Sequence, residues 1–311
     1  MSNSFGSRFK LTTFGESHGT ALGGIVDGCP AGLLYDAIFM EEEMQRRHIG
    51  THATSRLETD HVEILSGIFN NRTLGSPIAF CIRNEKQQSN DYDNLKHFFR
   101  PGHADFTSWK RYGLRDYRGG GRASGRETAA RVAGGAFAKM FLREQNISIS
   151  SQYIETLKVS DDNSVGGIIS CLVNGVPPGI GNPCFDKLNA RLAFAMMSIP
   201  SATGFEMGLG FEATQLTGRQ YRDEWTDNFY TTTNHCGGVQ GGISNGMPIS
   251  FRVAFHAPVT TTTGPIECID ETGNICSVSV SGRHDHCHVP RTAVVVEAMA
   301  ALVLADLILD K

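Results

Sequence analysis

Three short motifs place histidine beside glycine, and they hold the side chains in this sequence best suited to proton transfer. Residues 15–19 read Gly-Glu-Ser-His-Gly, residues 101–105 read Pro-Gly-His-Ala-Asp, and residues 282–288 read Gly-Arg-His-Asp-His-Cys-His. Histidine titrates near neutral pH, and glycine lets the backbone come close to a ligand. One such histidine is most often structural. Three of them, together with an arginine-rich segment, predict proton transfer on an anionic substrate.

Positive charge is concentrated between residues 100 and 131. This segment holds eight Arg and Lys against three Asp and Glu, a net charge of +5, so the rest of the chain carries −9. Arg118, Arg122 and Arg126 recur every four residues around a run of three glycines, residues 119–121. Guanidinium groups suit phosphate oxygens, and a glycine run before a helix start offers backbone N–H groups to an anion. The segment predicts a phosphate-type ligand, whose binding a side chain at the middle glycine, Gly120, should obstruct. A solvated basic face is the simpler alternative.

Two of the histidine motifs also allow other chemistry. His284, His286 and His288 would share one face of a strand and could bind zinc, but metal sites usually draw ligands from separated segments, so we expect no metal. Residues 15–19 match the Gly-x-Ser-x-Gly elbow of serine hydrolases. That elbow needs a helix after the serine, and residues 21–26 read instead as turn or strand. A hydrolase is therefore the weaker interpretation.

The elements that must position these motifs form a mixed α and β pattern. Helices are expected over residues 37–48 with Asp36 as the cap, from a Ser124–Glu127 capping box to about 142, between a cap at Asp186 and Pro200, and over 292–309. Strands are expected over residues 62–65, 77–82 and 249–255. Residues 292–309 are the longest apolar stretch, but Glu297 and Asp306 interrupt it. It is also short for a bilayer span, so it predicts a buried helix.

Composition excludes several classes of protein. The 311 residues are 40% hydrophobic and 19% charged, values that indicate a globular protein rather than a disordered one. A net charge of −4 argues against a general nucleic-acid binder. The eight cysteines form no Cys-x-x-Cys pair, which predicts reduced thiols and a cytoplasmic location without membrane attachment.

Taken in order, the motifs resemble those of the chorismate synthase family. The resemblance rests on residues 12–19, 100–105, 116–122, 126–128, 241–246 and 282–285, which span nearly the whole chain. It implies a carbon–oxygen lyase of the shikimate pathway that acts on a phosphate ester. In that reaction 5-enolpyruvylshikimate 3-phosphate loses phosphate and a ring hydrogen by 1,4-anti elimination and gives chorismate. The family requires reduced FMN, although no net redox change occurs.

The resemblance also implies a fold and an assembly. The expected fold class is α+β, a compact β-α-β sandwich with pseudo-repeated halves, formed by residues 1–311 as a single domain. The expected assembly is a homotetramer. Its partners are the small-molecule substrate and FMN, with neither nucleic acid nor membrane involved.

Roles carry over residue by residue. The resemblance assigns proton transfer to His18, which would protonate the leaving phosphate, to His103, which would protonate the reduced flavin, and to Asp285, which would remove the ring proton near flavin N5. Arg47 matches an arginine at the substrate end that is sometimes a nicotinamide-nucleotide contact, and Arg118 and Arg126 join it as anion ligands. The flavin-contacting positions are Arg122, Ala123, Ser124, Pro200, Ser201, Gly241, His256, Ala257, Pro258, Val259, Thr260 and Arg283.

This chain departs from the family pattern at the flavin segment. Residues 256–260 read His-Ala-Pro-Val-Thr where Lys-Pro-Thr-Ser-Ser is usual, and His286 replaces a proline. These changes leave open a second interpretation, a flavin- or phosphate-binding protein that has lost turnover. A metal hydrolase built on residues 284–288 is a distant third. The sequence shows no appended reductase domain, which favours an outside source of reducing equivalents.

Overall fold

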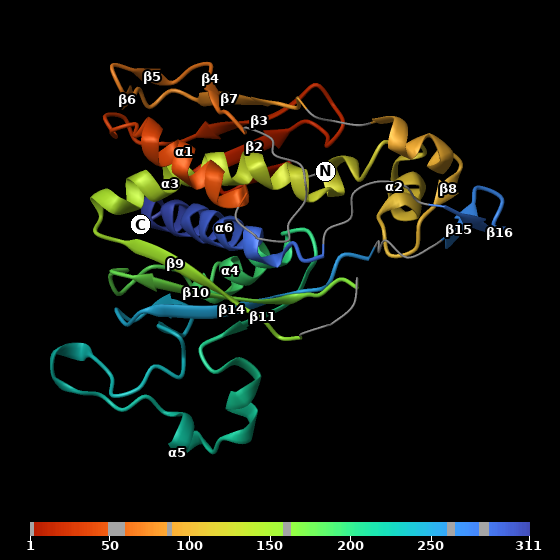
Figure 1. The fold of residues 1–311 in the computed structure, drawn as a ribbon. Coiled ribbons are helices and arrows are strands. Elements are labelled where there is room, and N and C mark those ends of the chain that lie inside the picture. The colour runs from red at the N-terminus through yellow and green to blue at the C-terminus, as the bar shows by residue number, and fades with distance from the viewer. Residues whose placement is uncertain (1–2, 49–59, 86–88, 158–162, 260–264, 280–285) are drawn as a thin grey trace.

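Two antiparallel sheets enclose a layer of helices in the computed structural model, which describes residues 3–48, 60–85, 89–157, 163–259, 265–279 and 286–311 (Figure 1). The first sheet has the strand order β1 (Ser4–Phe5), β2 (Lys10–Phe14), β3 (Ala21–Asp27), β7 (Ile78–Arg83) and β4 (Glu63–Ile64). The second has the order β11 (Ala202–Met207), β14 (Ile249–Phe255), β10 (Gly167–Asn174) and β9 (Ser148–Ile154). The expected β-α-β sandwich is therefore confirmed.

Each half of the chain supplies one sheet and one long helix. The first sheet precedes α3 (Thr128–Glu144), and the second precedes α6 (Val289–Leu309). In β14, buried and half-buried residues alternate because alternate side chains of a strand face the helices. The same alternation in β10 places Ile169, Cys171 and Val173 in the core.

The central layer consists of α1 (Ala37–Gln45), α3, α4 (Leu188–Met197) and α6. The last helix is long and apolar enough to span a membrane, but 83% of its apolar window is buried inside the protein. It is thus the predicted core helix. Gly135 allows the two long helices to approach closely, because a Cβ there would lie 2.4 Å from the Cβ of Ala298.

The helix termini correct two sequence predictions. Asp36 caps α1 as expected, accepting from the Phe39 N–H at 3.0 Å. Ser124 caps only a short 3₁₀ turn, η4 (Gly125–Glu127), because the Glu127 carboxylate binds other partners instead of completing a capping box. Lys187 rather than Asp186 precedes α4, since the Asp186 carboxylate accepts from Arg191 at 3.0 Å.

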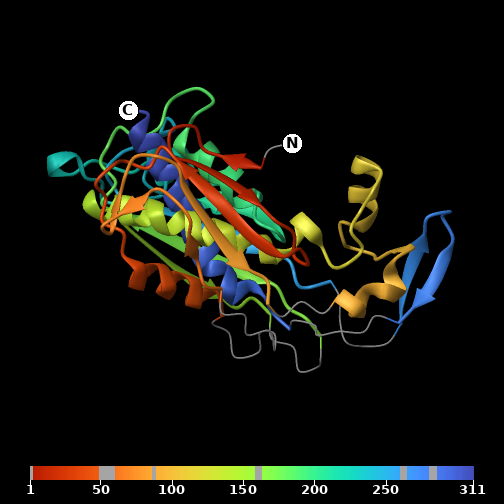
Figure 2. The same ribbon diagram turned by 90° about the horizontal axis from the view of Figure 1, so that it is seen from above.

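The remaining elements lie outside the sandwich. Figure 2 shows a side lobe apart from the main body, made of η2 (Ser89–Leu95), β8 (Phe98–Phe99), α2 (Asp105–Tyr112), β15 (Ile266–Asp270) and β16 (Ile275–Val278). An arm between β11 and β14 carries η5 (Gly210–Gln215), α5 (Gly218–Tyr221), η6 (Asp227–Phe229), β12 (Val239–Gln240) and β13 (Ile243–Ser244). Further short elements are the hairpin β5 (Ile68–Phe69) and β6 (Arg72–Thr73), and the turn η1 (Arg46–His48). A further turn, η3 (Gly121–Ala123), precedes η4.

A buried ionic cluster fixes η1 against the helical layer. The Lys139 ammonium on α3 binds the carboxylates of Glu43 and Glu297, the latter at 2.6 Å, and Arg46 binds the same two carboxylates. Burial raises the pKa of Glu297, but hydrogen bonds and charge from Arg46 and Lys139 outweigh it and lower the pKa to about 2. Two cations thus balance two anions, and Arg47 is held at a defined place beside them.

Candidate active site

His18 lies in the turn that joins two central strands of the first sheet. This turn follows β2 and precedes β3, and the Gly19 N–H closes it by donating to the Glu16 carbonyl at 3.0 Å. The imidazole is only 3% exposed and meets the ring of Tyr92 edge-on, with 5.0 Å between ring centroids. No helix follows the turn, so the serine-hydrolase interpretation of this motif is wrong.

The glycine run covers the other side of His18. Gly119 has φ +81°, and a Cβ there would lie 2.7 Å from Cδ2 and 2.9 Å from Nε2 of the His18 ring. A Cβ on Gly120 would instead meet Ser124 at 3.3 Å, so Gly119 is the glycine that contacts His18, and the obstruction of a ligand by a side chain at Gly120 stays a prediction. Ser17 also lines this contact, and its hydroxyl is buried without a hydrogen-bond partner among the described residues.

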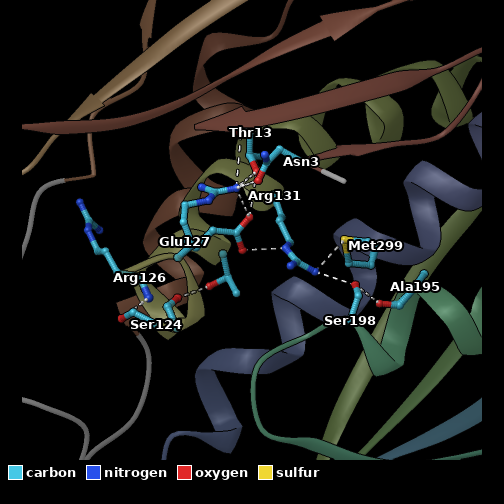
Figure 3. A network of polar contacts seen from close by, with 12 residues as sticks. Asn3, Thr13, Ser124, Arg126, Glu127, Arg131, Ala195, Ser198 and Met299 are labelled. Carbon is cyan, nitrogen blue, oxygen red and sulfur yellow. Dashed lines mark hydrogen bonds and ion pairs between the residues drawn. The ribbon is translucent and has the colours of Figure 1, made fainter. Parts of the chain in front are cut away.

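Arg122 and Glu127 fasten this region to its neighbours. The Arg122 guanidinium donates to the Gly15 carbonyl at 3.0 Å and to the Thr13 hydroxyl at 2.6 Å, so it holds the strand that leads into the His18 turn. Glu127 accepts from Thr13 at 3.0 Å and from Arg131 at 2.8 Å, and Arg131 also reaches Ser198 after α4 (Figure 3). One buried carboxylate therefore joins the first sheet to the end of α4.

Arg47 and Arg126 come together from distant parts of the chain. Both donate to the fully buried carboxylate of Asp60, Arg47 at 2.5 Å. Burial lowers the pKa of Arg47 to about 10; Asp60 opposes this effect, while the positive charges of Arg126 and Arg291 add to it. Because like charges are crowded here, an anionic ligand would relieve their repulsion. We refer to Arg47, Arg126, Arg291 and Asp60 as the arginine cluster.

Other arginines of the basic segment have protein partners. The Arg118 guanidinium forms a fork with Asp116, at 2.9 and 2.7 Å, and its hydrogen bonds lower the pKa of Asp116. Arg100 and Arg115 both contact Asp105, at 2.8 and 3.2 Å. Arg118 and Arg122 thus direct some of their N–H donors at protein groups, and their joint binding of one anion with Arg126 stays a prediction.

His103 lies at the edge of the side lobe. Its turn is fixed by Arg100, which forks with Asp105 and whose guanidinium lies 5.7 Å from the centroid of the Tyr92 ring. Tyr92 also contacts His18, so its ring lies between the His18 turn and Arg100, whose carbonyl accepts from the His103 N–H at 3.4 Å. His103 lines a cavity of about 390 Å³ whose other walls are mainly apolar, among them Phe99, Phe106 and Ile269.

Several predicted flavin positions form one cluster at the start of α6. Ser201 has φ +67°, its hydroxyl lies 2.5 Å from Nε2 of His288, and its carbonyl accepts from the His256 N–H at 3.1 Å. Pro200 and Ala257 adjoin this cluster in sequence, and the Pro258 carbonyl accepts from Ser164 at 2.6 Å. Val259 reaches the His103 turn, because a Cβ on Gly102 would lie 3.2 Å from its side chain.

Gly241 stands apart from this cluster. The carbonyl of the adjoining Gly242 accepts from the Leu188 N–H at the first turn of α4, whereas Ser201 follows the other end of that helix. A helix of ten residues is roughly 15 Å long. Ala123 and Ser124 lie in the turns beside His18 instead. Within the chain the predicted flavin positions thus fall into separate groups.

Three predicted residues, Thr260, Arg283 and Asp285, lie outside the described residues, as does His284. The described histidines of that motif do not form a strand, since His288 is the residue directly before α6. In the described part of the chain, no group of three His, Cys, Asp or Glu side chains could hold a metal ion. The proposed shared strand face of His286 and His288 is therefore wrong.

Sequence reasoning missed Asp60, Asn84, Tyr92 and Arg291, all of which contact or approach predicted site residues. No short motif in the sequence marks them. Arg291 lies three residues after His288, at the start of α6. Had the helix been predicted to begin at residue 289, this spacing would have placed both side chains on the same face of it.

Comparison with known proteins supplies the family. The family model described as Chorismate synthase matches residues 9–161 and 151–309. The chorismate synthase of Cytophaga hutchinsonii is 45% identical, over 98% of this chain and 97% of its own. That of Christiangramia forsetii is 46% identical, over 98% and 96%. A crystal structure of chorismate synthase has a TM-score of 0.75 and 32% identity, covering 98% of this chain and 93% of its own.

Proposed function

The chain belongs to the chorismate synthase family, and we propose that His18, His103 and Asp285 carry the proton transfers of the family's reaction. That reaction eliminates phosphate and a ring hydrogen from 5-enolpyruvylshikimate 3-phosphate and uses reduced FMN. One observation carries the proposal: His18 is buried in a turn beside Gly119, and the side chain of Asn84 forms hydrogen bonds both to this turn and to Arg126 of the arginine cluster.

Features of the site fit an anionic substrate and FMN. The Ser17 hydroxyl is buried next to His18 without a hydrogen-bond partner in the described residues, which is costly unless a ligand supplies one. The arginine cluster crowds like charges, and an apolar cavity adjoins His103. Bound reduced FMN would supply redox-active chemistry that no side chain has. Among the described residues that we expect to hold it are Ser124, Ser201, His256 and Val259.

The positions of His18, Arg47 and Arg126 support their proposed roles, and the roles of His103 and Asp285 are those that the family resemblance implies. His18 donates a proton to the oxygen of the leaving phosphate, and Arg47 and Arg126 bind the anionic groups of the substrate and stabilise the charge that develops there. His103 holds a proton directed at the flavin. Asp285 accepts the proton that leaves the ring. The substrate thus loses one proton, which Asp285 accepts, and one phosphate, which His18 protonates.

Turnover under anaerobic reducing conditions tests these roles. We expect His18→Ala, His103→Ala and Asp285→Asn each to bind FMN and to lose roughly 10²–10⁴-fold in kcat, the usual worth of general acid–base assistance. His97→Ala is the matched control, because His97 is exposed in the side lobe and pairs only loosely with Glu271, at 3.7 Å. Wild-type turnover by Asp285→Asn with saturating reduced FMN would exclude the proposed role of Asp285.

We also propose that the protein is a cytoplasmic homotetramer. The eight cysteines are unpaired thiols, which supports a reducing compartment. The arm exposes large apolar side chains: Phe211, Trp225, Phe229 and Tyr230. Such exposure supports burial of these side chains against another copy of the chain. The distance of Gly241 from the other flavin positions also supports assembly, because another copy could bring Gly241 to a flavin. Light scattering should give four times the 33.8 kDa chain mass, and a monomeric mass would contradict the proposal.

A further inference from the structure

We propose that Asn84 is a positioning residue that holds the His18 turn at a fixed place relative to the arginine cluster. Asn84 directly follows β7, and its N–H donates to the Thr20 carbonyl at 3.1 Å, which extends the pairing of β7 with β3 by one residue. Its side chain therefore lies at the end of the sheet where the His18 turn begins. The inference rests on the role of His18 proposed above.

The Asn84 amide connects the two parts of the site directly. Its NH₂ group donates to the Glu16 carbonyl at 3.1 Å and to the Gly19 carbonyl at 2.8 Å, the two residues that flank Ser17 and His18. Its oxygen accepts from Nε of Arg126 at 3.0 Å. Three hydrogen bonds thus join one side chain to both ends of the turn and to the guanidinium.

The partners themselves determine which way the amide points. Both groups on the nitrogen side are backbone carbonyls, which only accept, and the group on the oxygen side is a guanidinium N–H, which only donates. Turning the amide over would oppose like groups at all three contacts. A carboxylate cannot replace it, because Asp has no N–H to donate to the two carbonyls. An amide is the side chain of this size that satisfies all three partners.

The connection continues past Arg126 into the cluster. Arg126 donates to Asp60, which also accepts from Arg47 at 2.5 Å. A displacement of Arg126 on binding an anion would therefore reach the His18 turn through Asn84. We infer that the same side chain sets both the distance and the orientation between the anion-binding arginines and the proton donor.

Two substitutions test the inference. Asn84→Ala removes all three hydrogen bonds, and we expect kcat to fall about 100-fold with KM within roughly threefold, because misplacing a catalytic group by about 1 Å costs that much. Asn84→Asp keeps the size and attracts Arg126 but repels the two carbonyls. We expect it to lower kcat similarly and also to raise KM, since its charge offsets that of the cluster. It remains informative if the alanine variant folds poorly.

Ser66, which hydrogen-bonds to the other end of β7, offers a matched control. The Ser66 hydroxyl donates to the Pro77 carbonyl at 3.0 Å and accepts from the Ala79 N–H at 3.1 Å, far from His18 along β7. Ser66→Ala should lower the melting temperature slightly and leave kcat unchanged. Both Asn84 variants retaining wild-type kcat below their melting temperatures would overturn the inference.

A second readout does not depend on turnover. Histidine ring signals in NMR, with that of His18 identified by its loss in His18→Ala, are followed while inorganic phosphate is added. We expect phosphate to shift the His18 signal in the wild type, and to bind Asn84→Ala within threefold of the wild-type affinity without that shift. An equal shift in the variant would overturn the positioning role. A wild type that shows this coupling but no lyase activity would refute the proposed function alone.

Discussion

Gly119→Ala is the substitution whose effect the structure defines most narrowly. The added methyl group would lie 2.7 Å from Cδ2 and 2.9 Å from Nε2 of His18, and 3.2 Å from the Ser17 hydroxyl. Carbon atoms in contact lie about 3.5–4.0 Å apart, so the imidazole and the methyl group must separate by roughly 0.8 Å or more. The change therefore displaces the proposed proton donor without removing it.

Two free-energy effects can be separated at this position. Gly119 has φ +81°, and an L-residue in that left-handed region costs about 1–2 kcal/mol, which lowers the free energy of unfolding. The displacement of His18 acts on the rate instead. A misplacement near 1 Å costs about 100-fold in rate, so we expect kcat to fall about that much while KM changes by less than threefold.

Gly113→Ala is the matched control for the backbone strain. Gly113 ends α2 with φ +74°, and no described atom lies within 4 Å of its ideal Cβ. The assay measures kcat and KM anaerobically with saturating reduced FMN, and urea denaturation gives the free energy of unfolding of each variant. Equal losses of stability with a loss of kcat only in Gly119→Ala support the reasoning. Wild-type kcat in Gly119→Ala, or an equal loss of kcat in Gly113→Ala, would refute it.

Two further predictions concern charge. Because Arg118 lowers the pKa of Asp116, this carboxylate stays ionised through neutral pH, and its negative charge stabilises the protonated form of nearby His18. Asp116→Asn should therefore move the alkaline limb of the kcat profile to lower pH, and an unchanged limb would contradict this. The pKa of Glu297 is about 2 in the folded state, below the value near 4.5 of the unfolded chain. Its ionised form therefore contributes about 3 kcal/mol to the free energy of unfolding above pH 4.5, and this contribution is lost as pH falls through 2. The stability difference between the wild type and Glu297→Gln, measured by urea denaturation, should therefore shrink over that range, and a constant difference would contradict it.

The sequence predicted the parts of the fold that local patterns encode. Asp36 caps α1, the alternation over residues 249–255 forms β14, and the apolar stretch from residue 292 lies within the buried helix α6. Each of these depends on neighbouring residues and on the period of a helix or strand. The caps at Ser124 and Asp186 failed because their side chains, or those of their expected partners, bind arginines instead.

Charge counting along the chain located an arginine-rich segment but not the site. Arg100, Arg115 and Arg118 find carboxylates within the segment itself, at Asp105 and Asp116. Spacing along a sequence gives no distance between guanidinium and carboxylate groups in loops, because these depend on the backbone path. A count of basic residues thus measures only the net charge of the segment. An anion site requires positive side chains that neighbouring carboxylates do not fully neutralise.

The arginine cluster shows why such a site is built from distant segments. Arg47 follows α1, Arg126 precedes α3 and Arg291 begins α6, so three helices of the central layer bring their ends together. Two of the guanidinium groups are held by different parts of the core: the buried ionic cluster fixes the turn of Arg47, and the end of the first sheet holds Arg126 through Asn84. The positive charges of Arg126 and Arg291 repel that of Arg47, and the rigid core together with Asp60 keeps these groups close to one another. The ion pairs of Lys139, Glu43 and Glu297 therefore have a functional consequence. They hold Arg47 close to the other arginines, so that a bound anion relieves the repulsion between these positive charges.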